Sequence, residues 1–167
     1  FTAIAAAIAR HEAVLIACHD EAVCAQVAAR LRAAGIPEAR LRLLVAPAND
    51  TWARDHGPIT VLCRNEPTLL DFGFNGWGGK YAHDLDNLIT HRLHTQGAFG
   101  DAPLETVNLI LEGGSIEVDG QGTLLTTTRC LLAPTRNPGR TRAQIEAELA
   151  ALLGITRFLW LEHGYLA

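Results

Sequence analysis

The sequence has little charge and no concentration of basic residues. Only 19% of its 167 residues are charged, and 14 Lys and Arg against 18 Asp and Glu give a formal net charge of -4. No stretch gathers basic side chains into a stripe that could bind phosphates, so we expect no nucleic-acid partner. A mildly acidic protein attracts cations weakly, but so many proteins share this charge that it selects no substrate.

Long apolar runs and paired cysteines are also missing. The apolar opening, residues 1 to 8, gives way to Arg10 and His11 and is too short to span a membrane. The cysteines show no CxxC pair and no zinc-like spacing, which favours reduced thiols in the core. They are Cys18, Cys24, Cys63 and Cys130. We therefore expect no membrane span and no metal.

The length suits one domain, because a chain of this order can bury roughly two thirds of the surface that its unfolded form exposes. The chain starts at Phe1 without an initiator Met and stops soon after the apolar run Phe158 to Leu161. We therefore expect residues 1–167 to form one partial domain, truncated on its C-terminal side.

Apolar runs alternate with helical patterns in the first third of the chain. The run Val14 to Cys18 is followed by Asp20, a favoured helix cap, and then by apolar residues at helical spacing up to Gly35. A second apolar run covers Leu41 to Ala46. This order predicts a strand, a helix and a strand, with a parallel or mixed sheet.

The same alternation continues to the end of the chain. Turn residues Asp119 to Gly122 predict a hairpin, and Thr141 with Gln144 has the spacing of a capping box. The predicted strands are 59–63, 68–74, 104–111, 115–118, 123–132 and 158–161; the predicted helices are 83–96 and 141–154; and 49–58 and 75–80 are predicted loops. Repeated mixed α/β modules are the expected fold class.

Two polar segments interrupt this pattern. The first, residues 49–58, contains Trp52 and Asp55, and the second places Glu112 after an apolar run and before Gly113 and Gly114. The glycines suggest backbone angles that other residues avoid. The alternatives are structural: a solvated loop in which Asp55 pairs with an arginine, and a tight turn or bulge with an exposed Glu112.

Paired carboxylates suit a planar cation. Each carboxylate can accept two N–H donors of a guanidinium, and Trp52 could add a stacking wall. The same groups could also bind an amine, a metal or an internal arginine. Phosphate binding by the glycine-rich loop 76–79 is disfavoured by its spacing, and a metal site at His83, His91 and His94 lacks further ligands.

Three motifs resemble the agmatine deiminase family, which also includes the bacterial, Porphyromonas-type peptidylarginine deiminases. They are Asn-Asp-Thr-Trp-Ala-Arg-Asp-His-Gly-Pro-Ile at 49–59, Phe-Asn-Gly-Trp-Gly-Gly-Lys at 74–80, and Glu-Gly-Gly-Ser-Ile-Glu-Val-Asp-Gly-Gln-Gly-Thr-Leu-Leu-Thr-Thr at 112–127. Arg-Asn-Pro at 136–138 and the closing segment 163–167 are also similar to family sequences. The resemblance covers nearly the whole chain.

This resemblance implies a pentein-type α/β propeller and a cytoplasmic enzyme that hydrolyses a small cationic guanidine to a ureido product and ammonia, without a cofactor. By motif position, Asp55 would grip the guanidinium, Glu112 would hold it from another module, and Trp52 would line the substrate channel. His56 stands where family sequences commonly have Thr.

In the family a cysteine thiolate attacks the guanidinium carbon and a histidine handles protons. Those motifs follow the segments matched here, and none of the four cysteines has the nucleophile's context, so we expect this chain alone to be inactive. The alternatives are a peptidylarginine deiminase and a noncatalytic guanidinium-binding module. Uncovered sheet edges in a partial propeller would favour a homo-oligomer.

Overall fold

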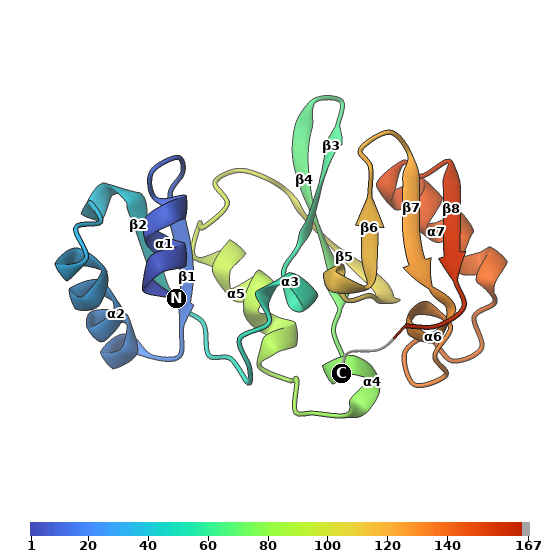
Figure 1. The fold of residues 1–167 in the computed structure, drawn as a ribbon, viewed down its shortest axis with the longest axis horizontal. Helices are drawn as coiled ribbons and strands as arrows, with labels where there is room; N and C mark the ends of the chain where they lie inside the picture. The colour runs from blue at the N-terminus through green and yellow to red at the C-terminus, as the bar shows by residue number, and fades with distance from the viewer. Residues whose placement is uncertain (165–167) are drawn as a thin grey trace.

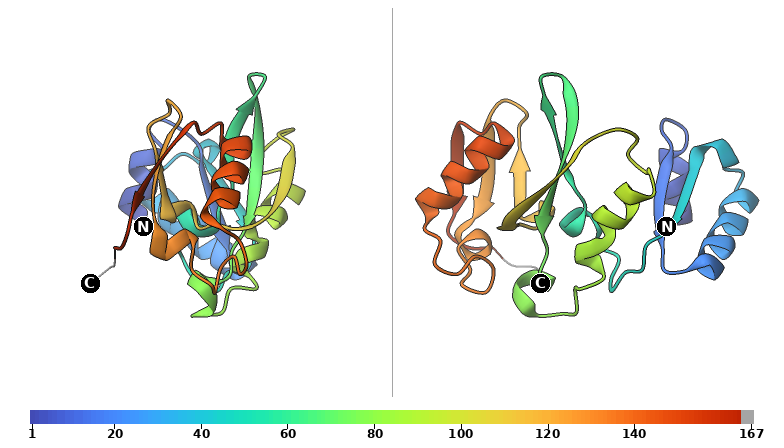
Figure 2. Two further views of the ribbon diagram at one scale, coloured as in Figure 1. Left: turned by 90° about the vertical axis from the view of Figure 1, so that its right-hand side faces the viewer. Right: turned by 180° about the vertical axis from the view of Figure 1, so that it is seen from behind.

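The computed structural model describes residues 1–164, which fold into three mixed α/β units arranged in a row along the long axis of the molecule (Figure 1). The view from behind shows the same row (Figure 2, right). Residues 165–167, part of the closing segment that resembles family sequences, lie outside the described residues. Within residues 1–164, no helix is both long and apolar enough to cross a lipid bilayer.

The first unit confirms the predicted strand, helix and strand. It comprises α1 (Thr2–Ile8), β1 (Val14–Cys18), α2 (Glu21–Ala33), η1 (Glu38–Arg40) and β2 (Leu41–Val45), with β1 parallel to β2. Asp20 caps α2 by accepting the Val23 N–H at 2.8 Å. Gly35, with φ 80°, follows the helix end.

The middle unit contains a hairpin and a parallel third strand. Its elements are α3 (Ala53–His56), β3 (Ile59–Cys63), β4 (Glu66–Gly73), α4 (Gly76–Gly79), η2 (Asp86–Leu88), α5 (Ile89–Thr95) and β5 (Leu104–Ile110), with strand order β3-β4-β5. The turn is shorter than predicted. Arg64 and Asn65 both have positive φ, as a two-residue hairpin turn requires, so Glu66 and Pro67 belong to β4.

The predicted loop 49–58 and helix 83–96 both differ from the structure because the two segments bind each other. Asp86 is fully buried and accepts the backbone N–H groups of Asn49 at 2.7 Å and Asp50 at 3.2 Å. The Asn49 side chain in return accepts the N–H of Leu85 at 2.8 Å. Regular helix therefore starts only at α5, while the last residues of the loop form the single turn α3.

The last unit is formed by η3 (Gly113–Ser115), β6 (Ile116–Val118), β7 (Thr123–Thr127), α6 (Thr128–Leu131), α7 (Arg142–Leu153) and β8 (Arg157–Leu161). The predicted hairpin and the Thr141–Gln144 capping box are confirmed. The predicted strand 123–132 is wrong beyond Thr127. The Thr127 hydroxyl accepts the Cys130 N–H at 3.2 Å and so starts a helix where the strand was expected to continue.

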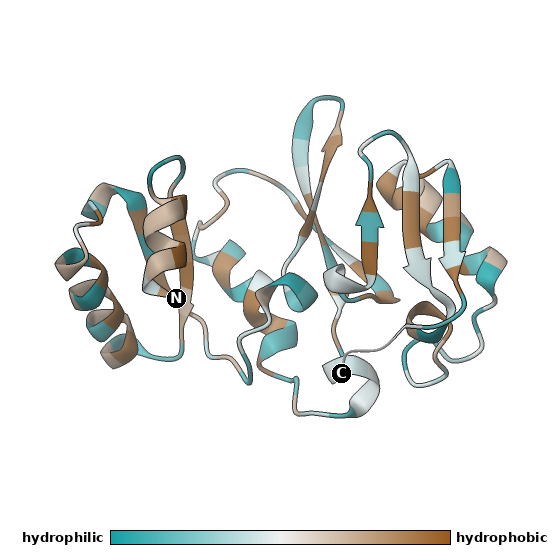
Figure 3. Cartoon of the chain, viewed as in Figure 1, coloured by the Kyte–Doolittle hydropathy of each residue, from teal (hydrophilic) through white to brown (hydrophobic). Residues whose placement is uncertain are grey.

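One core joins the middle and last units. Strands β4, β5 and β7 and helix α7 pack together through Leu70, Leu109, Leu124, Ile145 and Leu149, each no more than 2% exposed. Hydrophobic residues cover much of β1, β3 and β7, while α2 alternates between hydrophobic and hydrophilic residues (Figure 3). The shared core fixes the end of β5, and thus Glu112, relative to the last unit. The expected class of repeated α/β modules is confirmed.

Candidate active site

The two polar segments singled out in the sequence meet where α3 lies against η3. Asp55 belongs to α3, and Glu112 directly precedes η3, just after β5 ends (Figure 1). The backbone N–H of Gly114 donates to Oδ1 of Asp55 at 3.0 Å. A residue from the start of the middle unit and a motif from the start of the last unit therefore form one site.

The two glycines of this motif are required by space and not by backbone angles. A Cβ on Gly113 would collide with the carbonyl oxygen of Arg54, and a Cβ on Gly114 would collide with Oδ1 of Asp55. Neither glycine has positive φ, so the expected backbone freedom is not the reason for the pair. The Glu-Gly-Gly sequence lets α3 approach the backbone of η3 closely.

Asp55 is half-buried, and each of its oxygens already accepts one hydrogen bond. Besides Gly114 on Oδ1, the indole Nε1–H of Trp77 donates to Oδ2 at 2.9 Å. The alternative that Asp55 pairs with an arginine is not what the structure shows in residues 1–164. Trp77 was not predicted as a site residue, although it lies in the second motif.

Glu112 is buried and holds an internal guanidinium. The Nε–H of Arg136 lies 2.7 Å from Oε1 and 3.0 Å from Oε2 of Glu112, and the two side chains are only 11% and 3% exposed. The alternative of a turn with an exposed Glu112 is therefore wrong. The alternative that the carboxylate binds an internal arginine is confirmed for Glu112. Within the described residues, Arg136 uses only Nε on this carboxylate, which leaves further lone pairs available.

Two asparagines hold the segment that carries Arg136. The Asn75 side chain donates to the Thr135 carbonyl at 2.8 Å and accepts the Gly78 N–H at 2.9 Å. The Asn137 side chain exchanges two hydrogen bonds of 2.9 Å with the backbone of Ile110, at the end of β5. The motifs at 74–80 and 136–138 thus fix the surroundings of Glu112, a role that the sequence did not reveal.

Trp52 is 58% exposed and lies at the residue before α3. No hydrogen bond joins its indole to Asp55 or Glu112 within the described residues. The predicted stacking role of Trp52 therefore stays a prediction. The tryptophan that contacts Asp55 is Trp77.

His56 points into the protein, away from solvent. Its side chain is 6% exposed and lies edge-on to Phe74, with ring centroids 5.8 Å apart. Burial lowers the pKa of His56 below its ordinary value, and the nearby carboxylates of Asp86 and Asp55 oppose this shift only in part. His56 is thus neutral at pH 7 and adds no positive charge beside Asp55.

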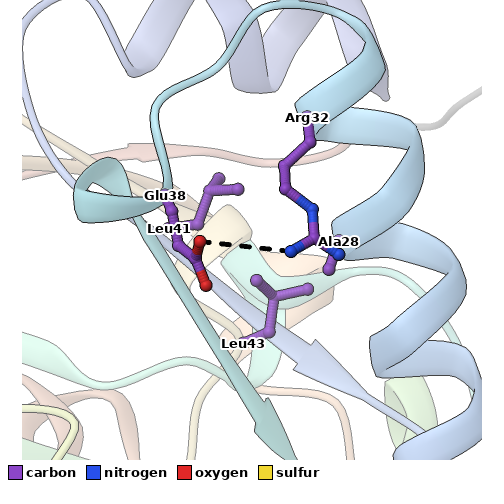
Figure 4. Close-up of a pocket in the computed structure, with 5 residues that line it drawn as sticks. All are labelled: Ala28, Arg32, Glu38, Leu41 and Leu43. Carbon is purple, nitrogen blue, oxygen red and sulfur yellow. Dashed lines mark ion pairs between the residues drawn. The ribbon is translucent and has the colours of Figure 1, made fainter.

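Neither of two hollows in the described part of the chain contains Asp55 or Glu112. A cavity of ≈ 320 Å³ lies behind α3 and is lined mainly by apolar side chains such as Leu15, Ile89 and Phe99. A smaller one of ≈ 220 Å³ lies between α2 and β2, beside the exposed pair Arg32–Glu38 with N···O 4.0 Å (Figure 4).

The described residues form no metal centre. Across residues 1–164, no three His, Cys, Asp or Glu side chains gather closely enough to hold a metal ion. His94 makes a 2.9 Å hydrogen bond to the carbonyl of Ala102. The groups that the structure shows around the α3–η3 contact are two carboxylates, an indole and a guanidinium.

The fold and site define a class of protein. The chain has the mixed α/β fold of the pentein deiminases, which the matching solved structures share. The chain belongs to the Porphyromonas-type peptidyl-arginine deiminase family, whose model matches residues 1–167.

Relatives and solved structures agree with this assignment. An agmatine deiminase of Stutzerimonas stutzeri is 40% identical over 98% of this chain and 44% of its own length. A solved Porphyromonas gingivalis protein is 47% identical, with a TM-score of 0.87 over 100% of this chain and 48% of that one. A C. jejuni agmatine deiminase variant with substrate bound is 30% identical, with a TM-score of 0.86 over 98% and 46%. The chain thus spans less than half the length of these proteins.

Proposed function

We propose that the chain is part of a guanidine deiminase acting on agmatine or a related small guanidine. Water adds to the guanidinium carbon and one C–N bond breaks, which yields a ureido product and ammonia. The observation that carries this proposal is the contact of α3 with η3, which places the half-buried Asp55 beside the segment of Glu112. Membership of a deiminase family supports the reaction type.

Asp55 and Glu112 are the proposed guanidinium-binding carboxylates. Each Asp55 oxygen accepts one N–H donor and keeps a further lone pair for the substrate. Glu112 already holds the Arg136 guanidinium through a single N–H, which supports its ability to bind this chemical group. Two carboxylates keep a guanidinium charged and oriented, and a charged guanidinium has the more electrophilic carbon.

Trp52 is the proposed wall of the substrate channel. Its indole is 58% exposed directly before α3, so an alkyl chain leading to the guanidinium could lie against it. Agmatine carries such a chain with a terminal amine, whereas peptidyl-arginine carries a backbone. We expect Trp52→Ala in the longer protein to raise KM more than it lowers kcat.

We propose that residues 1–167 are a partial domain of a longer enzyme that contains the nucleophile elsewhere. Relatives that match the chain are about twice as long. By motif position, none of Cys18, Cys24, Cys63 and Cys130 corresponds to the nucleophile of the family. The 167-residue chain should therefore bind a guanidine without turning it over.

Ammonia release tests the proposal. The chain and the longer protein that contains it would be incubated with agmatine, arginine and an arginine peptide, with Asp55→Asn and Asp101→Asn as matched variants, since Asp101 is exposed and lies before β5. We expect activity only in the longer protein, its loss in Asp55→Asn, and no change in Asp101→Asn. Ammonia from the 167-residue chain would contradict the absent nucleophile.

The choice of substrate separates the remaining alternatives. The matching family is named after peptidyl-arginine deiminases, so an arginine peptide should be tested beside agmatine. Faster turnover of the arginine peptide would assign a peptidylarginine deiminase. No turnover by either protein, with retained agmatine binding, would instead indicate a noncatalytic guanidinium-binding module. The expected homo-oligomer and cytoplasmic location stay predictions.

A further inference from the structure

The turn that carries Trp77 has an unusual backbone. Gly76, Trp77, Gly78 and Gly79 have φ of 66°, 59°, 82° and 80°, and Trp77 and Gly78, with ψ of 46° and 35°, lie in the left-handed region inside α4, which follows β4 (Figure 1). Hydrogen bonds from Gly79 N–H to the Asn75 carbonyl and from Lys80 N–H to the Gly76 carbonyl, 2.8 and 3.0 Å, close the turn. Glycine adopts the left-handed backbone conformation readily, but a tryptophan is strained in it.

Aromatic side chains around Trp77 stabilise its strained backbone conformation. Its ring lies edge-on to Phe74, with centroids 5.0 Å apart at 89°, and to Tyr81, at 5.7 Å and 84°. This packing fixes the plane of the indole, whose Nε1–H donates to Oδ2 of Asp55. A bulky residue in left-handed backbone persists only where contacts over-determine it, and such residues concentrate at functional sites.

The same turn also contacts Thr135, the residue next to the partner of the second carboxylate. The Asn75 side chain donates to the Thr135 carbonyl, and Gly78 packs so tightly on the Thr135 side chain that a Cβ would not fit. Nη1 of Arg136 lies 3.5 Å from the position of that missing Cβ. One turn of five residues therefore contacts both Asp55 and Thr135, the residue before the Arg136 that holds Glu112.

We propose that the turn Asn75–Gly79 positions the two carboxylates relative to each other, with Trp77 as a positioning residue for Asp55. The inference deepens the proposed function and rests on it. Orienting Asp55 before the substrate arrives lowers the cost of binding, since a carboxylate free to rotate would first have to be ordered. Trp77 acts through Asp55 and needs no contact with the guanidinium.

The chain offers a matched pair of substitutions. Trp77→Phe keeps an aromatic ring against Phe74 and Tyr81 but removes the N–H donor. Trp160→Phe is the control, because it removes an equivalent donor away from the turn. Nε1–H of Trp160, on β8, donates to Oε1 of Glu146, on α7, at 2.7 Å. Asn75→Asp is a second variant in the turn, which keeps the acceptor for Gly78 N–H and loses the donor to Thr135.

Two measurements on the 15N-labelled chain test the inference. The three tryptophans give three indole N–H signals, and Asp55→Asn should move the Trp77 signal in the free chain while the Trp160 signal stays in place. Agmatine affinity is then measured by calorimetry. Trp77→Phe should weaken binding about tenfold, Asn75→Asp several-fold, and Trp160→Phe less than about twofold.

Each outcome decides between the claims. Unchanged agmatine affinity in folded Trp77→Phe and Asn75→Asp would overturn the positioning role and leave the proposed function standing. If Trp77→Phe does not fold, Asn75→Asp and the indole signals decide alone. Absence of agmatine binding by the unchanged chain, together with no ammonia release by the longer protein, would overturn the proposed function and this inference with it.

Discussion

The Nε–H of Arg136 lies within 3.0 Å of both oxygens of Glu112, in a site where the two side chains are almost completely buried. A buried ion pair gains little over a packed apolar pair, but the loss of one partner leaves the other charge unpaired in a medium of low dielectric constant. The pair is therefore a point at which the folded state is sensitive to single substitutions.

We expect Arg136→Ala to lower the free energy of unfolding by about 3–5 kcal/mol, because Glu112 would keep a buried and unpaired charge. Arg32→Ala is the control, since the Arg32–Glu38 pair is mostly exposed and should contribute little. Urea unfolding followed by circular dichroism measures both. If the double variant Glu112→Gln with Arg136→Gln were no more stable than Arg136→Ala, the buried charge would not be the cause.

Gly113→Ala should destabilise the chain by about 1–3 kcal/mol and weaken guanidine binding, because its new methyl group collides with the Arg54 carbonyl and pushes α3 away from η3. Gly164→Ala is the control, because its Cβ would meet Thr127 Cγ2 at 3.7 Å, an ordinary contact. Thermal unfolding and agmatine calorimetry give the two readouts. A stable Gly113→Ala variant with normal affinity would show that α3 does not need this close approach.

Stability should fall as the pH is lowered below about 6.5, the ordinary pKa of histidine, because of His56. Burial lowers the pKa of His56 in the folded state, so between the two pKa values the unfolded state binds more protons. This group then contributes a slope of up to about 1.4 kcal/mol per pH unit, which levels off once the pH is below the folded-state pKa.

Urea unfolding between pH 7.5 and 5.5 checks this slope in the unchanged chain and in His56→Thr, which removes the titrating group. His19→Gln serves as the matched control, because His19 is exposed. The slope should flatten only in His56→Thr. An equal slope in all three proteins would assign the pH dependence to other groups.

The cysteines should differ sharply in reactivity. Cys63 is exposed at the end of β3, whereas Cys18 is 1% exposed and burial, with a smaller effect of the neighbouring Cys24, raises the pKa of its thiol to about 12. Since the thiolate is the reactive form, labelling at pH 8 should be at least about a hundredfold faster at Cys63. Mass spectrometry after brief alkylation identifies the labelled sites.

Two controls accompany this labelling. Cys63→Ser should remove the fast phase, and denaturant should make all four thiols react alike. Rapid modification of Cys18 in the folded chain would contradict its burial and would reopen the question of whether it can act as a nucleophile.

Local sequence determined most of the elements. The apolar runs at 14–18 and 41–46, the cap at Asp20 and the capping box at Thr141 fix structure within a few residues of themselves, and each is found as predicted. Two of the predictions that failed, at 128–132 and 83–88, were overturned by a side chain: the hydroxyl of Thr127 started a helix, and the buried Asp86 bound a loop 36 or 37 residues away in sequence.

The sequence motifs also indicated the family and pointed to Asp55 and Glu112, but only the tertiary structure decided what these carboxylates touch. Trp77 lies 22 residues from Asp55, and Arg136 lies 24 residues from Glu112. No local pattern encodes which of 14 Lys and Arg approaches a given carboxylate, or that Gly113 and Gly114 are small because α3 lies on them. Such contacts arise because packing of the shared core fixes where each strand ends, and the polar groups at those ends then meet.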